Sequence, residues 1–196
     1  MQIKQKSSFL YYLGKNLFKL MFVLVYRCKS SGQENIPDDS GAIIAPNHMS
    51  FFDPPLTGCF MKKDLYFMAK QELFSVPILG FLIKRTNAFP VKRGKQDLNA
   101  FRNAFSLLKN KKSLLMFPEG TRSKTGIMGK ARAGVGMVAC TCQVPIVPVK
   151  IVNTNNMKKF KRLEIKYGKP VYPPKEYTKD DYLKLSEKVL NEIKSL

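Results

Sequence analysis

Short apolar runs recur along the chain and alternate with longer stretches in which apolar residues repeat at helical spacing. The runs predict buried strands at 41–47, 65–69, 87–91, 113–117, 145–151 and 163–167. Helical character is found at 76–84, 96–109, 131–142 and 179–194. This alternation predicts an α/β fold, a layered sheet flanked by helices, with functional residues in the loops that leave the strand ends.

The first apolar stretch, residues 7–27, reads SSFLYYLGKNLFKLMFVLVYR and differs from the others in carrying lysines. Its leucines fall on one side of a helix, and the other side mixes aromatic rings with Lys15 and Lys19. These lysines leave no uncharged run of the roughly 20 residues that a bilayer-crossing helix needs. The stretch predicts either a helix lying among lipid headgroups, with its apolar face down and its lysines reaching the phosphates, or a core helix packed on the domain.

Charge favours the membrane interpretation of this helix. Residues 1–33 contain six basic residues and no acid, and no small-residue cleavage site follows that would mark a removed signal peptide. We expect residues 1–33 to form an N-terminal amphipathic, membrane-associated segment. Residues 34–196 are expected to form one folded domain, because a chain of this length can bury a proper core.

The whole chain is strongly basic, with Lys+Arg 34, Asp+Glu 14 and a formal net charge of +20. Such a field gathers anionic membranes or polyanions. Nucleic acid is an alternative partner, but the sequence lacks an RNP-like aromatic strand, zinc-finger spacing and a clear recognition helix. The four cysteines form no C-x-x-C pair, and one histidine leaves too few ligands for zinc. We expect no metal site, and free thiols in a reducing, cytosol-facing setting.

The stretch NHMSFFD places the single histidine, His48, between a strand end and a helix start, with Asp53 five residues later. Asp53 followed by Pro54 predicts a helix N-cap with proline at the first helical position. The short loop also allows Asp53 to accept the Nδ1 hydrogen of an imidazole exposed at a pocket edge, which makes His48 a general base. The alternatives are a structural histidine and an aspartate that only caps the helix.

No side chain of the protein is expected to form a covalent intermediate. The sequence has no G-x-S-x-G, and Ser50 supplies the only hydroxyl near the histidine. We therefore expect His48 to deprotonate a substrate hydroxyl, which then attacks an activated acyl carbonyl directly.

A second stretch, FPEGTRS at residues 117–123, follows another predicted strand. Pro118 and Gly120 force a tight turn that exposes backbone amides beside Arg122, an arrangement typical of a phosphate site. An ordinary loop salt bridge is the alternative interpretation. Cations also follow two further predicted strands, in MAKQEL and FPVKR: Lys70, Lys92 and Arg93.

Four blocks in this order, NHMSFFD, FPVKR, FPEGTRS and VPIVPV, resemble the motifs of the glycerolipid acyltransferases. Between residues 41 and 149 the chain is similar to the 1-acyl-sn-glycerol-3-phosphate acyltransferase family, in its bacterial, phosphatidic-acid-forming type. The resemblance implies a glycerolipid acyltransferase-like α/β fold over 34–196 and a strand at 144–149 that lines the acyl-side pocket. It also implies that His48 is the catalytic base and Asp53 its partner. The residues implied to hold the glycerol phosphate are Lys70, Arg93, Glu119, Gly120, Thr121 and Arg122.

By this resemblance the protein is expected to move a fatty acyl group from acyl-CoA or acyl-ACP to the sn-2 hydroxyl of 1-acyl-glycerol 3-phosphate, giving phosphatidic acid. Glycerol 3-phosphate or another lysolipid is the alternative acceptor. The donor arrives activated, so no cofactor is expected beyond this co-substrate. The expected partners are an anionic membrane surface, lysophosphatidic acid and the acyl carrier, and no nucleic acid. The expected location is the cytoplasmic face of the membrane, bound peripherally or monotopically.

Overall fold

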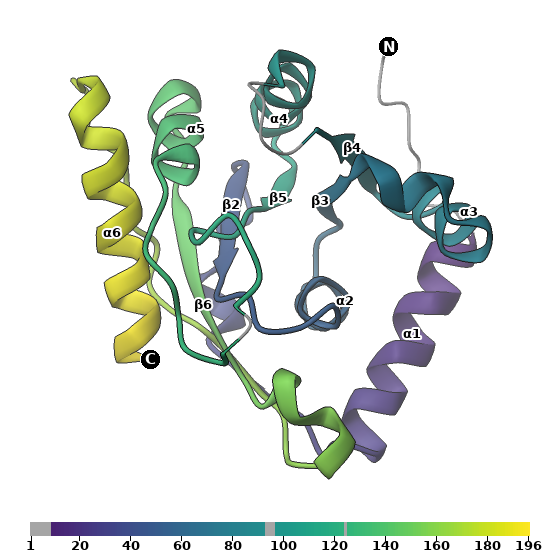
Figure 1. Ribbon diagram of the computed structural model, residues 1–196. Coiled ribbons are helices and arrows are strands. Elements are labelled where there is room, and N and C mark those ends of the chain that lie inside the picture. Colours follow the sequence, from purple (N-terminus) through teal and green to yellow (C-terminus); the bar gives the residue numbers. More distant parts are fainter. Residues whose placement is uncertain (1–8, 93–96, 124) are drawn as a thin grey trace.

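The computed structural model describes residues 9–92, 97–123 and 125–196 (Figure 1). The α-helices of this part are α1 Phe9–Leu24, α2 Asp53–Cys59, α3 Pro77–Lys84, α4 Leu98–Lys109, α5 Gly134–Cys142 and α6 Lys179–Ser195. Its strands are β1 Lys29–Ser31, β2 Ala42–Pro46, β3 Leu65–Lys70, β4 Ala88–Val91, β5 Ser113–Leu115, β6 Ile146–Val152 and β7 Glu164–Tyr167. Three short 3₁₀ helices connect them: η1 Gln33–Asn35, η2 Gln71–Ser75 and η3 Thr154–Lys159.

The seven strands form one sheet in the order β1-β7-β6-β2-β5-β3-β4. Neighbouring strands pair in parallel, except that β6 and β7 are antiparallel. The five strands β6, β2, β5, β3 and β4 therefore run in one direction. Their carboxyl ends meet at one edge of the sheet, which is where open α/β sheets place their functional loops.

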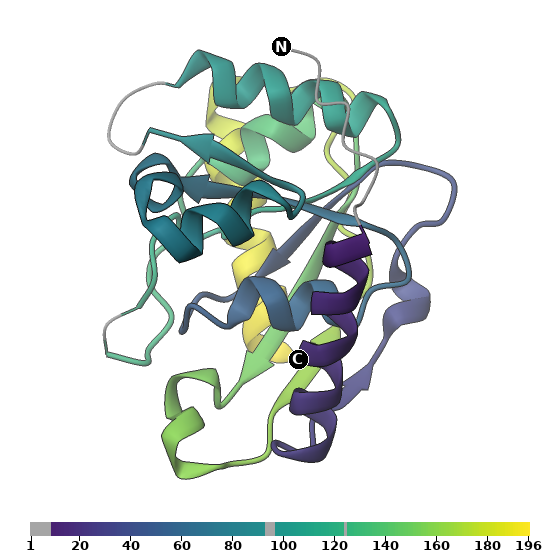
Figure 2. The same ribbon diagram turned by 90° about the vertical axis from the view of Figure 1, so that its right-hand side faces the viewer.

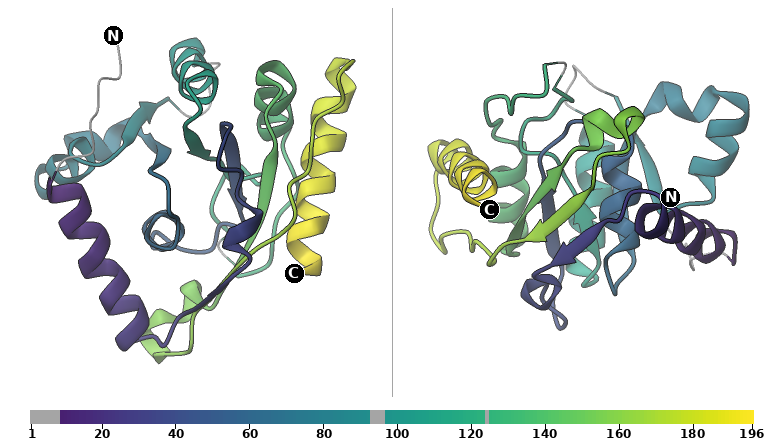
Figure 3. Two further views of the ribbon diagram at one scale, coloured as in Figure 1. Left: turned by 180° about the vertical axis from the view of Figure 1, so that it is seen from behind. Right: turned by 90° about the horizontal axis from the view of Figure 1, so that it is seen from below.

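Helices cover both faces of the sheet, as the views in Figure 1 and Figure 3 show. Alternate residues of β2 point to opposite faces, so Ile43 packs in one apolar core and Ile44 in the other. The first core includes residues of α4, α5 and α6. The second includes Phe22 of α1 and Leu56 of α2. The predicted α/β fold with a layered sheet is confirmed.

The predicted strands and helices correspond closely to those observed, because each strand run is apolar and at least partly buried. The strand β1 was not predicted. Its residues, Lys29–Ser31, are polar and pair with β7 only at the edge of the sheet. β1 lies within the segment 1–33 that the sequence assigns to the membrane, and the division of the chain at residue 33 stays a prediction.

One helix start differs from its prediction. Asp53 was expected to be an N-cap, but Phe52 occupies that position and Asp53 is the first residue of α2. The Asp53 carboxylate turns back to the amides of Met49 and Ser50, which precede the helix. The reason is the tight loop after β2: its amides have no backbone partner and donate instead to one carboxylate oxygen of Asp53.

The helix α1 packs against the domain with one face and leaves its leucine face uncovered. Tyr11 and Phe22 are buried, and Lys15 Nζ donates a hydrogen bond of 2.9 Å to the carbonyl of Met61. Because this ammonium bonds to the domain, the expectation that Lys15 reaches lipid phosphates is wrong. Burial also lowers the pKa of Lys15. Within the residues described, no helix has both the length and the hydropathy required to span a bilayer. The exposed apolar residues of α1 include Leu13, Leu17, Leu20 and Leu24.

Candidate active site

The loop after β2 is fixed to the neighbouring strand immediately before the histidine. Asn47 is buried, its Oδ1 accepts a hydrogen bond of 2.7 Å from the backbone amide of Ile151, and its Nδ2 donates one of 3.0 Å to the Ile151 carbonyl. The side chain thus continues the β2–β6 ladder beyond the last strand residue. This bidentate contact fixes where the chain leaves the sheet, and so where His48 lies.

His48 and Asp53 form the predicted pair, with Nδ1 2.9 Å from Oδ2. The same carboxylate oxygen accepts hydrogen bonds from the amides of Met49, at 2.6 Å, and Ser50, at 2.7 Å. Because this oxygen is an acceptor for every neighbour, Nδ1 carries the ring hydrogen and Nε2 is the nitrogen left to accept a proton. Asp53 is fully buried, which holds the imidazole in one orientation.

The imidazole is more enclosed than the sequence suggested. His48 is only 7% exposed, whereas we expected a ring exposed at a pocket edge. The cause is Phe117, whose ring stacks on the imidazole with a centroid distance of 3.7 Å and an interplanar angle of 13°. Phe117 was interpreted as the last residue of a strand, but β5 ends at Leu115, which frees the aromatic side chain to cover His48.

Glu119 connects the His48 loop to the segment that follows β5. It is buried, its Oε1 accepts a hydrogen bond of 2.8 Å from the backbone amide of His48, and its Oε2 accepts one of 2.7 Å from the amide of Gly129. The amide of Ser123 in turn donates to the carbonyl of His48 at 2.9 Å. Both backbone polar groups of the histidine are therefore bonded to the FPEGTRS segment.

Gly120 makes the sharp turn of that segment, with φ of +70°. A Cβ at this position would come within 2.8 Å of Cδ of Arg132, so the close approach of the arginine also requires a glycine. The amide of Arg132 donates a hydrogen bond of 2.9 Å to the carbonyl of Pro118. The turn therefore brings a second arginine, distant in sequence, alongside the predicted phosphate loop.

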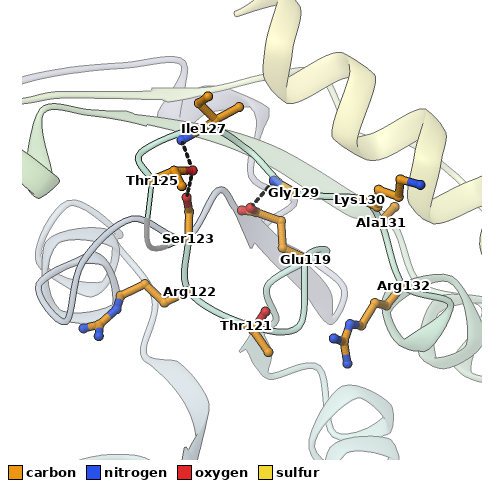
Figure 4. Close-up of a pocket in the computed structure, with 10 residues that line it drawn as sticks. All are labelled: Glu119, Thr121, Arg122, Ser123, Thr125, Ile127, Gly129, Lys130, Ala131 and Arg132. Atoms are coloured by element: carbon orange, nitrogen blue, oxygen red, sulfur yellow. Dashed lines mark hydrogen bonds between the residues drawn. The ribbon is translucent and has the colours of Figure 1, made fainter.

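A pocket of about 510 Å³ opens beside these loops (Figure 4). In Figure 4 the side chains of Arg122 and Arg132 lie on either side of Thr121, and Glu119 lies close to Gly129. Sequence reasoning missed Lys130 and Arg132. Residue 132 was assigned to a helix over 131–142, whereas α5 begins at Gly134 and leaves Arg132 in the loop before it. The basic run GKAR before α5 is the signal that could have identified them. The described lining residues are Glu119, Thr121, Arg122, Ser123, Thr125, Ile127, Gly129, Lys130, Ala131 and Arg132.

Arg122 also contacts the histidine loop from the pocket side. Its guanidinium carbon lies 3.8 Å from the ring centroid of Phe51, a cation–π geometry. Phe51 is 71% exposed, so the mouth of the site has an apolar side next to a cationic one. This combination suits a ligand with an anionic group and a hydrocarbon part.

Of the predicted cations, Lys70 is not among the described residues that line the pocket. Lys70 ends β3 and pairs instead with Glu72, with 3.2 Å between Nζ and Oε1, and both side chains are exposed. Arg93 lies outside the described residues. The strand at 144–149 is buried between the two cores, and its role beside an acyl chain stays a prediction.

The cysteines and acids of the described part do not converge on a metal site. No cluster of three or more histidine, cysteine, aspartate or glutamate residues is found there. The predicted free thiols are confirmed, since Cys28, Cys59, Cys140 and Cys142 are all unpaired.

Comparison with known proteins identifies the fold and the motifs. The model of the Acyltransferase family matches residues 27–152, which is well over half of the chain. The crystal structure of the 1-acyl-sn-glycerophosphate (LPA) acyltransferase PlsC from Thermotoga maritima superposes with a TM-score of 0.77. It is 28% identical in sequence, and the match covers 94% of this chain and 76% of that one.

Two relatives carry the name 1-acyl-sn-glycerol-3-phosphate acyltransferase. One from Bacillus subtilis is 29% identical over 167 residues, which is 83% of each chain. A chloroplast relative from Arabidopsis thaliana is 30% identical over 155 residues, 78% of this chain but only 43% of that protein. The chain thus spans less than half of the plant relative and most of the bacterial one. On the extent of the family match, the chain belongs to the acyltransferase family.

Proposed function

We propose that the protein transfers a fatty acyl group from a thioester of coenzyme A or acyl carrier protein to the sn-2 hydroxyl of 1-acyl-glycerol 3-phosphate, producing phosphatidic acid. The names of its relatives support this acceptor. The main structural support is the pair of hydrogen bonds that joins the backbone of His48 to Glu119 and Ser123. These bonds hold the His48–Asp53 pair against the wall of a basic pocket.

In this reaction Nε2 of His48 accepts the proton of the sn-2 hydroxyl as the oxygen attacks the thioester carbonyl. The carbon–oxygen bond forms, the carbon–sulfur bond breaks, and the leaving thiolate takes the proton from the imidazolium. Asp53, which accepts the Nδ1 hydrogen, stabilises the imidazolium between these two proton transfers. A general base of this kind contributes about a hundred- to ten-thousand-fold in rate.

The acceptor phosphate binds, in this proposal, between Arg122 and Arg132 beside the hydroxyl of Thr121. Both arginines line the pocket together with Thr121, and the Arg122 guanidinium, which lies over Phe51, would turn toward the phosphate on binding. Two guanidinium groups and a hydroxyl supply the several donors that a phosphate dianion requires. Gly120 permits the turn that brings Arg132 alongside. Glu119 acts as a positioning residue, because its carboxylate oxygens are occupied by the amides of His48 and Gly129.

We further propose that α1 attaches the protein to an anionic membrane surface at the cytoplasmic side. Its leucine face is exposed while its opposite face packs on the domain. Deleting the helix is a poor test, because Phe22 belongs to the core and β1 follows directly. Replacing Leu13 and Leu17 by serine is the better test, since both side chains are exposed. Flotation with anionic vesicles should then weaken by about tenfold or more, and unchanged flotation would contradict attachment through α1.

The reaction is tested by offering the purified protein several acceptors with each thioester donor and identifying products by mass spectrometry. The expected product is phosphatidic acid from 1-acyl-glycerol 3-phosphate. Preferential acylation of glycerol 3-phosphate, or of a lysolipid with a different headgroup, would reassign the acceptor and keep the chemistry. If no acceptor is acylated by either donor, the proposed function is wrong.

A further inference from the structure

The helix α3 packs on η2 and β4 and leaves a large apolar surface uncovered. Its residues read PILGFLIK, and within the described part no side chain of α3 belongs to either apolar core. We propose that α3 is a second membrane-contact element, which inserts its apolar side chains into an anionic bilayer alongside α1. The inference deepens the proposed function, and it rests on that proposal only in taking the acceptor to be a lipid.

The helix is held to the domain by its backbone, which leaves its side chains free. Gly80 is the only buried residue of α3, and a Cβ there would come within 2.3 Å of the Phe74 carbonyl oxygen in η2. Helix α3 therefore packs tightly on η2 through a glycine, and its large side chains turn outward.

Those outward side chains form a patch of unusual apolar content for a surface helix. Ile78 is 78% exposed, and Leu82, one turn later on the same face, is 54% exposed. Contiguous exposed apolar patches of this kind mark interaction surfaces. The exposed apolar residues of the patch are Val76, Ile78, Leu79, Phe81 and Leu82.

The charges around the patch fit anionic lipid. Residues 65–92 contain four basic residues and one acid, Glu72, which pairs with Lys70. At the end of α3 the guanidinium of Arg85 lies 3.5 Å from the ring centroid of Phe81. An aromatic ring with a cation above it, at the end of an apolar helix, is the arrangement found at the headgroup level of membranes.

The position of α3 relates the proposed membrane contact to the His48 loop. Figure 2 shows α1, α2 and α3 on the face turned toward the viewer, and Figure 3 shows α1 and α3 on the side opposite α6. The exposed Phe51 lies two residues before α2, which packs on α1. A bilayer that contacts α1 and α3 would lie on the side of the molecule that also carries α2, the helix that follows the His48 loop. A lipid acceptor could then reach the base without leaving the membrane surface.

Lipid is a better occupant of this patch than a second copy of the chain. Two copies would each bring a formal charge of +20, together with the cations at the end of α3. Like charges repel across an interface, whereas anionic headgroups neutralise them. The test therefore includes the oligomeric state as an outcome.

The first experiment uses the absence of tryptophan from the sequence. Ile78→Trp introduces a single reporter on α3, and Leu183→Trp introduces a matched one on an exposed position of α6, across the sheet. With mixed phosphatidylcholine and phosphatidylglycerol vesicles we expect a blue shift at position 78 and quenching by brominated lipid. We expect neither at position 183. An unshifted, unquenched reporter at position 78 would overturn the proposal.

The second experiment measures the contribution of the patch. The double variant Ile78→Ser with Leu82→Ser should partition about tenfold or more weakly into the same vesicles. The control pair Leu98→Ser and Leu183→Ser, exposed on α4 and α6, should partition like the unchanged protein. Wild-type-like partitioning of the α3 variant, or a loss of self-association in its place, would contradict the proposal. A reporter that inserts in a protein acylating no acceptor would remove the proposed function alone and leave the α3 contact standing.

Discussion

The two loops that build the site use their polar groups in different ways. In the loop after β2, His48 and Asp53 are buried, and the carboxylate oxygen facing the ring accepts three hydrogen bonds. In the segment after β5, Arg122 and Arg132 line a pocket of about 510 Å³. The first loop has most of its polar groups bonded within the protein, with the second oxygen of Asp53 buried and unbonded, and the other loop presents donors that a ligand would use.

This difference follows from what each loop is proposed to do. Proton transfer requires an imidazole in one tautomer and one orientation, which buried hydrogen bonds can hold. Phosphate binding requires cations that stay solvated until the ligand arrives, because an unpaired buried charge is costly. Substitutions in the first loop should therefore change the rate of chemistry, and those in the second should change the affinity for the acceptor.

The largest expected effect is that of His48→Ala. Loss of the base should lower kcat about a hundred- to ten-thousand-fold and leave the KM for the acceptor nearly unchanged. Steady-state kinetics with a lysophosphatidic acid acceptor provides the measurement, with vesicle flotation as a control for attachment. Near-normal kcat would remove the general-base role.

Arg122→Ala should have the opposite kinetic signature. Removing one charged donor to the phosphate should raise the acceptor KM by about ten- to a hundredfold, with a smaller change in kcat. The thioester KM serves as the internal control, since it should not move. A change confined to the thioester would place Arg122 on the donor side of the pocket.

Glu119→Gln tests the connection between the two loops. An amide has one acceptor oxygen where the carboxylate has two, so either the His48 or the Gly129 amide would lose its partner. We expect unfolding to become easier by about 1–3 kcal/mol, measured by denaturant titration. We also expect kcat to fall more than KM rises. A pure KM effect would instead indicate direct contact with the phosphate.

Lys70→Ala should have the smallest effect of the four. Its ammonium pairs with Glu72 away from the pocket, and an exposed ion pair contributes about 0–1 kcal/mol. The acceptor KM should change less than about twofold, with unaltered stability. A change as large as that of Arg122→Ala would support the role that the family resemblance implies for Lys70.

Sequence patterns predicted the strands well because the central ones, β2, β5 and β6, are buried on both faces. Runs such as Ala42–Pro46 are short, continuous apolar segments, which are typical of strands in a parallel sheet covered on both faces. The strand Lys29–Ser31 escaped notice because a short polar edge strand has no such pattern. The helix α3 was predicted as a helix, yet its periodicity did not reveal that its apolar residues face outward.

Contacts in the site between residues close in sequence could be predicted, whereas contacts between distant segments could not. The five-residue spacing of His48 and Asp53 sufficed to predict their hydrogen bond, because the intervening loop is short. The cover of Phe117 over the ring and the arrival of Arg132 beside Gly120 depend on the path of a long loop. The family resemblance drawn from the four motifs is confirmed by the match over residues 27–152.

The attachment of α1 to the domain sets a geometric limit on the substrate. Phe22 lies in the core, and the backbone carbonyl and ammonium of Lys15 bond to Cys59 and Met61 at the end of α2. A helix held at these points cannot swing independently of the sheet. The fold then fixes the distance between Nε2 of His48 and any surface that α1 contacts. If α1 contacts the membrane as proposed, the enzyme would favour acceptors whose reacting hydroxyl lies at that same distance from the lipid chains.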